Sequence, residues 1–124
     1  MERDAEAIEA ELIPQVAERF KALADAGRLQ ILSALQRGER SVGELVQATG
    51  RSQPNVSQHL ASLTHAGIVE ARREGTRVYY RIGDEAIRRI CGAVRDSVVA
   101  RARLLRREAA ALASRHRVRV GGER

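Results

Sequence analysis

The segment from Ser52 to Ala66 holds the side chains whose types and spacing could read the surface of another molecule. Its apolar residues recur at helical spacing, and a wheel drawn at about 100° per residue turns small and amide side chains outward. Amides can pair with adenine in a DNA groove, and serine can bond to a base or a phosphate. No acid lies between Arg51 and Gly67, so nothing here would repel a phosphate backbone. The outward group is Pro54, Asn55, Gln58, Ala61 and Ser62, flanked by Ser57 and His59.

The residues that follow change from helical to alternating periodicity, which predicts a β-hairpin over residues 68–82. A two-residue turn at residues 74–75 pairs positions whose numbers sum to 149 and gathers the apolar side chains on one face. That register sets Arg72 opposite Arg77, with Arg73 beside the tip, and like charges opposed across a ladder are unfavourable. A nearby anionic backbone would make the cluster favourable. The pattern therefore favours a wing that grips phosphate over a charged edge that only resists aggregation.

Local start and stop signals place these two features next to each other. Ser41 and Glu44 have the spacing of a capping box, which predicts a short helix that ends at Gly50. Ser52 caps the next helix after only a tight turn. Residues 41–66 therefore have the pattern of a helix-turn-helix, although a polar surface helix with no partner is the alternative.

Helices are also predicted on both sides of this unit. An acidic helix over residues 4–13 is interrupted or restarted at Pro14, and further helical stretches cover residues 15–24 and 28–37. Residues 84–114 predict one long helix whose apolar stripe so small a domain cannot bury, so a partner helix is its natural cover. The stripe consists of Ile87, Cys91, Val94, Val98, Ala102, Leu105, Ala109 and Leu112.

Length and composition limit the class of protein. The 124 residues predict one domain over residues 1–117 and a flexible tail over residues 118–124. The net charge of +6 resides in residues 101–124, which hold eight arginines against two acids, whereas the start of the chain is acidic. A single cysteine excludes an intrachain disulfide, and no apolar run is long enough for a membrane span. We expect a soluble, cytoplasmic protein. We do not expect an enzyme, because the sequence shows no nucleophile with a paired base.

Five runs of the sequence together resemble the arsenic-repressor (ArsR/SmtB) family of winged-helix regulators. The resemblance covers about residues 15–85. It implies a mainly α winged helix-turn-helix with about five or six helices and one β-hairpin. It also implies a homodimer, formed through residues 1–25 and 84–114, that represses transcription from operator DNA and leaves it when an effector binds. The runs are FKALAD (20–25), RLQIL (28–32), SVGEL (41–45), SQPNVSQHL (52–60) and RREGTRVYY (72–80).

The residues and the resemblance together suggest which side chains contact double-stranded DNA. Each subunit would lay the helix over residues 52–66 into a major groove, and the two-fold dimer would read an inverted repeat. Gln53 is included because of the family match, and His59 lies where the family's helix meets DNA. Base or phosphate contacts are expected from Gln53, Asn55, Ser57, Gln58 and His59, and backbone contacts from Arg72, Arg73 and Arg77.

The family's usual effector sites do not match this sequence. Members that bind arsenic or cadmium carry a cysteine pair in the stretch matching Arg40 to Leu45, which has no cysteine here. Members with a site on the last helix carry a set of Asp, His and Glu ligands. The positions that correspond to it here are Asp84, Ala86, Ser97 and Ala100.

A zinc site needs three or four converging ligands, and the lone cysteine and three histidines do not supply them. We therefore expect no metal and no cofactor, and the effector stays open. Cys91 is either a small core residue or a thiol that responds to oxidants between subunits or through a single adduct. A winged-helix module that binds proteins is the remaining alternative function.

Overall fold

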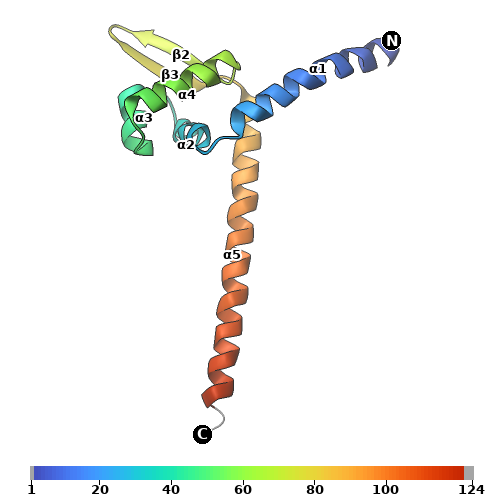
Figure 1. Cartoon of the computed structure of the whole chain (residues 1–124), viewed down its shortest axis with the longest axis vertical. Helices are drawn as coiled ribbons and strands as arrows, with labels where there is room; N and C mark the ends of the chain where they lie inside the picture. Colours follow the sequence, from blue (N-terminus) through green and yellow to red (C-terminus); the bar gives the residue numbers. More distant parts are fainter. Residues whose placement is uncertain (1, 122–124) are drawn as a thin grey trace. The chain divides into compact units, whose positions relative to one another are not determined.

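The computed structural model describes residues 2–121, which form five helices and a small sheet (Figure 1). The chain divides after Arg88 into two compact units, and within the described residues the second consists of the last helix from Arg89 onward. None of the described helices is both long and apolar enough to cross a lipid bilayer. The elements are α1 (Glu2–Leu23), α2 (Ala26–Leu35), β1 (Arg40–Ser41), α3 (Val42–Thr49), α4 (Gln53–His65), β2 (Val69–Glu74), β3 (Arg77–Ile82) and α5 (Glu85–Gly121).

The first helix corrects the prediction made for Pro14. That residue neither interrupts nor restarts the helix, because α1 is continuous with Pro14 inside it. A proline in a helix interior removes one backbone hydrogen bond, here the bond to the carbonyl of Ala10. Both residues are exposed, so water can hydrogen-bond to that carbonyl.

The helices of the helix-turn-helix begin and end at the residues that the sequence indicated. Ser41 and Glu44 form the capping box in both directions, with bonds of 3.2 Å each. Gly50 ends α3 in the left-handed conformation, at a φ of 71°. The Ser52 side chain then accepts from the backbone N–H of Asn55 and caps α4.

The helix before this unit starts two residues earlier than predicted, at Ala26. The side chain of Asp25 accepts a 3.0 Å hydrogen bond from the backbone N–H of Arg28, which caps α2. Branched apolar side chains from α2, α3, α4 and the hairpin meet in one core. Its fully buried members are Ile31, Leu32, Leu35, Leu45, Val56, Leu60, Leu63, Ile68 and Val69.

The hairpin is present, but the predicted register is wrong. The paired positions sum to 151, so Ala71 lies opposite Tyr80 and not opposite Val78. The turn consists of Gly75 and Thr76, and only the glycine has a positive φ, of 61°. A glycine at the first central position is the signature of a type II′ turn, which suits the twist of a hairpin. The ladder slides by two residues, so each side chain stays on its predicted face.

The sheet contains one strand that the sequence did not indicate. β1 has only two residues and pairs with β3, with Arg40 opposite Tyr80 and Ser41 opposite Tyr79. The strand order is therefore β1-β3-β2, with the long hairpin strand β3 in the middle. This pairing connects the wing to the residue that caps α3.

The last helix is longer than residues 84–114. It runs to Gly121, so residues 118–121 of the predicted flexible tail are helical, and residues 122–124 lie outside the described residues. The predicted stripe includes apolar side chains that are largely exposed in the single chain, including Val98 at 63% and Leu112 at 70%. α1 likewise exposes Ile8, Leu12, Ile13, Val16 and Phe20.

Two glycines of α3 should respond to alanine in opposite directions. Gly50→Ala should lower the free energy of unfolding by about 1 kcal/mol, because a Cβ is disfavoured at a left-handed φ. Gly43→Ala, inside the helix and with no atom closer than 4.0 Å to the added Cβ, should raise it by about 0.5 kcal/mol. Urea unfolding at one fixed protein concentration measures both. Equal effects would contradict the assignment of the turn.

Candidate nucleic-acid interface

The outward face of α4 is positioned by the buried face of the same helix. Val56, Leu60 and Leu63 are at most 1% exposed, and α4 packs against α2, α3 and β2. The opposite face is open to solvent. This face presents Gln58, together with Pro54, Ala61 and Ser62, while Ser57 is exposed at its flank and Gln53 is exposed in the first turn of the helix, on the core side of the wheel.

Two of the expected contact residues have partners within the protein instead. The side chain of His59 is only 14% exposed, and its Nε2 lies 3.7 Å from a carboxylate oxygen of Asp25. Asn55 is half-buried, and its side-chain oxygen accepts a 3.3 Å hydrogen bond from Arg51. Arg51 also donates a 2.7 Å bond to Gln30. These contacts hold the beginning of α4 against α2, a role that sequence reasoning did not assign.

A glycine makes this close approach possible. An added Cβ at Gly27 would lie 2.6 Å from Nε2 of His59 and 2.9 Å from the guanidinium carbon of Arg51. Such distances are shorter than ordinary van der Waals separations. Gly27, between the helical stretches predicted over residues 15–24 and 28–37, is therefore a buried packing position, and a glycine at this place in the sequence is a signal that could have pointed to a close neighbour.

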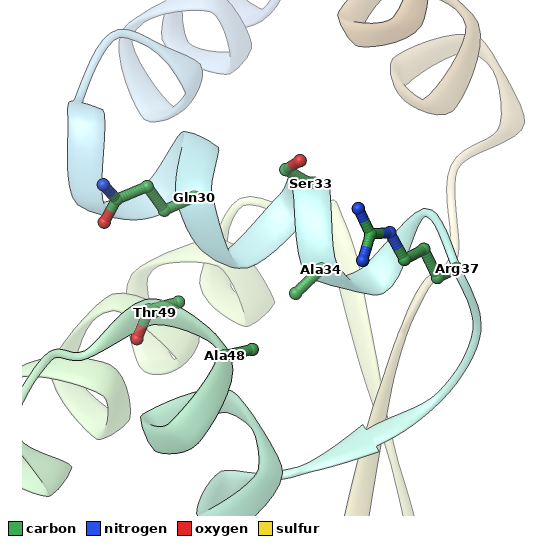
Figure 2. Close-up of a pocket in the computed structure, with 6 residues that line it drawn as sticks. All are labelled: Gln30, Ser33, Ala34, Arg37, Ala48 and Thr49. Carbon is green, nitrogen blue, oxygen red and sulfur yellow. The ribbon is translucent and has the colours of Figure 1, made fainter.

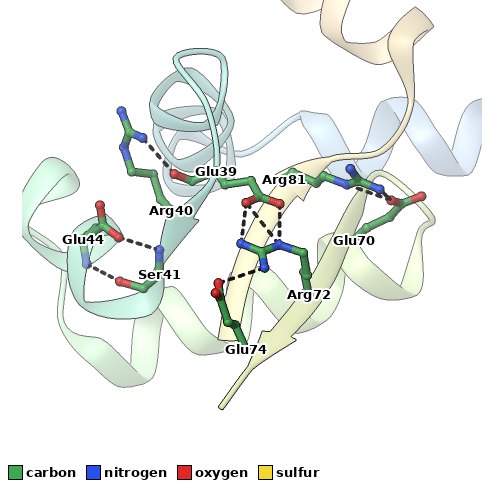
Figure 3. A network of polar contacts seen from close by, with 8 residues as sticks. All are labelled: Glu39, Arg40, Ser41, Glu44, Glu70, Arg72, Glu74 and Arg81. Carbon is green, nitrogen blue, oxygen red and sulfur yellow. Dashed lines mark hydrogen bonds and ion pairs between the residues drawn. The ribbon is translucent and has the colours of Figure 1, made fainter. Parts of the chain in front are cut away.

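The three arginines of the wing have different surroundings. Arg72 lies opposite Tyr79, so the predicted opposition to Arg77 is wrong. The Arg72 guanidinium instead binds Glu39 and Glu74, as Figure 3 shows. Arg73 and Arg77 form no ion pair or side-chain hydrogen bond with any residue that the structure describes. Because Arg77 lies opposite Glu74, the neighbour of Arg73 in the strand, these two arginines occupy opposite faces of the hairpin near its tip.

The residues considered as possible metal ligands are not gathered into a metal site. Asp84 accepts hydrogen bonds from the backbone N–H groups of Ala86 and Ile87 and pairs with Arg19. Within residues 2–121, no three His, Cys, Asp or Glu side chains are grouped to hold a metal ion. Cys91 is a half-buried free thiol, and burial raises its pKa, which lowers the thiolate fraction at neutral pH.

One open pocket lies between α2 and the end of α3 (Figure 2). Two of its polar side chains already have partners: Thr49 donates to the carbonyl of Leu45, and Gln30 accepts from Arg51. The pocket has no acid, histidine or cysteine in its lining, so it offers no general acid or base. Its lining is Gln30, Ser33, Ala34, Arg37, Ala48 and Thr49.

The geometry defines the class of protein. A capped short helix, a tight glycine turn, a second helix with a polar outer face and an antiparallel hairpin make up a winged helix-turn-helix, a DNA-binding architecture. Residues 25–71 match the family model described as "Bacterial regulatory protein, arsR family". The chain belongs to this ArsR family, whose members are regulators and not enzymes, as the sequence predicted.

Individual relatives agree with this assignment. The HTH-type transcriptional regulator Rv0324 of Mycobacterium tuberculosis is 51% identical over 65% of this chain and 36% of that protein. The biofilm growth-associated repressor of Agrobacterium fabrum is 40% identical over 64% of this chain and 68% of that protein. The solution structure of the homodimeric winged helix-turn-helix domain of Mb0332 from Mycobacterium bovis has 48% identity and a TM-score of 0.67, over 77% of this chain and 87% of that one. Three curated relatives of 47% to 51% identity are matched over 36% to 58% of their own length.

The cap of α2 should make stability depend on pH. The backbone N–H of Arg28, followed by the charges of Arg28 and His59, holds the pKa of Asp25 below its ordinary 3.8. A lowered pKa stabilises the folded state above the unfolded value, and this contribution is lost as pH falls through the folded pKa. Asp25→Asn keeps a capping oxygen but cannot titrate. Urea unfolding between about pH 6 and pH 3 should therefore show a flatter decline for the variant, and parallel curves would contradict the role of this carboxylate.

Proposed function

We propose that this chain is a homodimeric transcriptional repressor that binds an inverted-repeat operator through α4 and the tip of the wing. The observation that carries the proposal is the acid-free outer face of α4 beside two wing arginines that have no partner among the described residues. The name of the Agrobacterium fabrum relative as a repressor and the DNA-binding domain of Mb0332 support it. Such a regulator acts where DNA is, in the cytoplasm.

The mechanism divides the contacts between bases and backbone. Gln53, Ser57 and Gln58 are exposed on α4 and can reach base edges or phosphates when the helix lies in a major groove. Arg73 and Arg77 project from the two faces of the wing tip and can pair with phosphates on either side of it. Asn55 and His59 would need to leave Arg51 and Asp25 to touch DNA, so we assign them a smaller part.

Dimerisation is supported by the apolar faces of α1 and α5. Both helices expose large apolar side chains that water disfavours, and a second copy of the chain could cover them. Residues 2–18 hold six acids against one arginine, whereas residues 101–119 hold seven arginines against one acid. This complementarity favours pairing of α1 of one subunit with α5 of the other. The homodimeric structure of the Mb0332 domain supports the same state.

We further propose that release from DNA does not use the family's two usual metal positions. Arg40 to Leu45 contains no cysteine, and Asp84 is engaged by Arg19 and by the start of α5. The second candidate for the release mechanism is an oxidant that reacts with the thiol of Cys91. The raised pKa of that thiol disfavours direct attack on an oxidant, and a DNA-release screen repeated on Cys91→Ser tests it.

Salt dependence tests the role of the wing. An operator selected from random DNA should bind with an affinity that falls steeply with ionic strength, because phosphate binding releases counterions. Arg73→Gln and Arg77→Gln should each reduce the slope of log affinity against log salt by about 0.9 for every phosphate that the variant no longer neutralises. Arg81→Gln is the matched control, since Arg81 pairs with Glu70 at 3.0 Å, and it should leave the slope nearly unchanged. If the selection enriched no DNA sequence and the chain bound no DNA even at low salt, a protein-binding winged helix would be favoured instead.

Discrimination between base pairs tests the role of α4. Gln58→Ala should lower discrimination at one or two base pairs of the selected operator by about 1–3 kcal/mol and leave non-specific affinity nearly unchanged. Binding to a panel of single-base operator variants measures this. A uniform loss across all the variants would mean that Gln58 touches only the backbone.

Two neighbouring leucines test the dimer. Leu105 lies on the predicted stripe of α5, whereas Leu104 is turned away by about 100°, although the two are similarly exposed, at 52% and 54%. Leu105→Asp should move the equilibrium toward monomer and Leu104→Asp should not, as measured by sedimentation at several concentrations. Equal behaviour of the two variants would exclude the stripe as the dimer interface.

A further inference from the structure

One side chain crosses the whole sheet of the wing. Arg72 starts on β2, and its guanidinium carbon lies 5.1 Å from the ring centre of Tyr79 on the central strand. Beyond that ring it reaches Glu39, the residue before β1, with its Nε 3.1 Å and its Nη2 2.9 Å from the two carboxylate oxygens. Its Nη1 donates a 3.0 Å bond to Glu74. Figure 3 shows the guanidinium between the two acids.

This arrangement differs from an ordinary surface ion pair. Isolated exposed pairs contribute little, but two-point Arg–carboxylate geometry and a network of several charges are the exceptions. All three guanidinium nitrogens of Arg72 are engaged, and both oxygens of Glu39 accept from it. The interaction also lowers the pKa of Glu39, so this acid stays charged. Three of the five guanidinium N–H groups of Arg72 therefore point at carboxylates, and a phosphate could use only the other two, beside two negative charges.

Glu39 is in an unexpected place for a protein that approaches DNA. It lies two residues before Ser41, the cap of α3, and it binds an arginine of the wing whose other arginines would meet phosphate. A lone acid there would repel the nucleic acid. Its binding to Arg72 neutralises that charge and links the hairpin to the start of the helix-turn-helix.

We propose that Glu39 and Arg72 form a brace that positions the wing, so that Arg73 and Arg77 are held where they can grip phosphate and Arg72 itself is a positioning residue. The inference rests on the proposed DNA-binding function. It reassigns one of the three wing arginines that the sequence alone grouped together. It also gives a role to an acid 33 residues away in sequence.

The neutral variant of the acid separates a brace from a direct phosphate contact. If Arg72 bound phosphate, Glu39→Gln would free it and remove a repulsive charge, so operator affinity would rise. If the pair is a brace, Glu39→Gln should weaken operator binding about fivefold although it removes a negative charge. Arg72→Gln should show a similar decrease, and the double variant should be no weaker than either single one.

Two further variants test positioning in particular. Arg72→Lys keeps the charge but cannot hold two acids with planar geometry, so it should behave like Arg72→Gln. The effect of Arg77→Gln on operator affinity should shrink in the Glu39→Gln background, because the tip is then already misplaced. A pair that only stabilised the fold would leave these two effects additive. Arg81→Gln, which breaks the other ion pair of the hairpin, should leave operator affinity within about twofold of the wild type.

A readout without DNA keeps the brace separate from the proposed function. Amide hydrogen exchange of the free full chain should become faster in β2 and β3 for Glu39→Gln and Arg72→Gln, and not for Arg81→Gln. Unchanged exchange, a gain in affinity for Glu39→Gln, or wild-type behaviour of Arg72→Lys would each overturn the brace. If the two variants exchange faster but the wild-type protein binds no operator, the proposed function is overturned and the brace is still supported.

Discussion

Three apolar side chains on one side of α4 set the orientation of every side chain that this helix presents at the proposed interface. Val56, Leu60 and Leu63 are almost fully buried, and each such burial contributes roughly 1.5–3 kcal/mol. A rotation of α4 by one residue, about 100°, would expose this stripe and push Ser57 or Asn55 into the core. The polar outer face is therefore a consequence of the core. Substitutions on this outer face could change its chemistry without changing the fold. The direction in which the face points could not change without a change in the core.

The sequence predicted well those features that depend on neighbours in the chain. The caps at Ser41 and Ser52 and the stop at Gly50 each need only three or four residues, so their signals are local. The hairpin register shows the limit of pattern alone. A period of two fixes the face of each side chain but not a slide by two residues, and only the turn chemistry of Gly75 decides between the two ladders.

Other features depend on tertiary packing and could not be read locally. Nothing near Arg72 in sequence indicates Glu39, and nothing near His59 indicates Asp25, because helix and strand packing brings these pairs together. The length of α5 is a different case. Between Gly92 and Gly121 the chain has no glycine or proline, so no stop signal supported the end predicted near residue 114. The helix continues into the predicted tail although Val118 and Val120 are weak helix formers, because no helix breaker stands before Gly121.

The distribution of charge affects how the free energy of DNA binding would be divided between the wing and α4. Residues 1–100 are neutral overall, so the net charge of +6 gives the helix-turn-helix itself no general attraction for DNA. With Arg72 neutralised by acids, the wing offers two unpaired cations instead of three. Each phosphate contact adds to affinity without reading sequence, whereas in the proposed complex α4 would read the base edges. Fewer cations held in fixed positions therefore leave a larger share of the binding free energy to the exposed polar face of α4, which favours discrimination between operators over tight binding to any DNA.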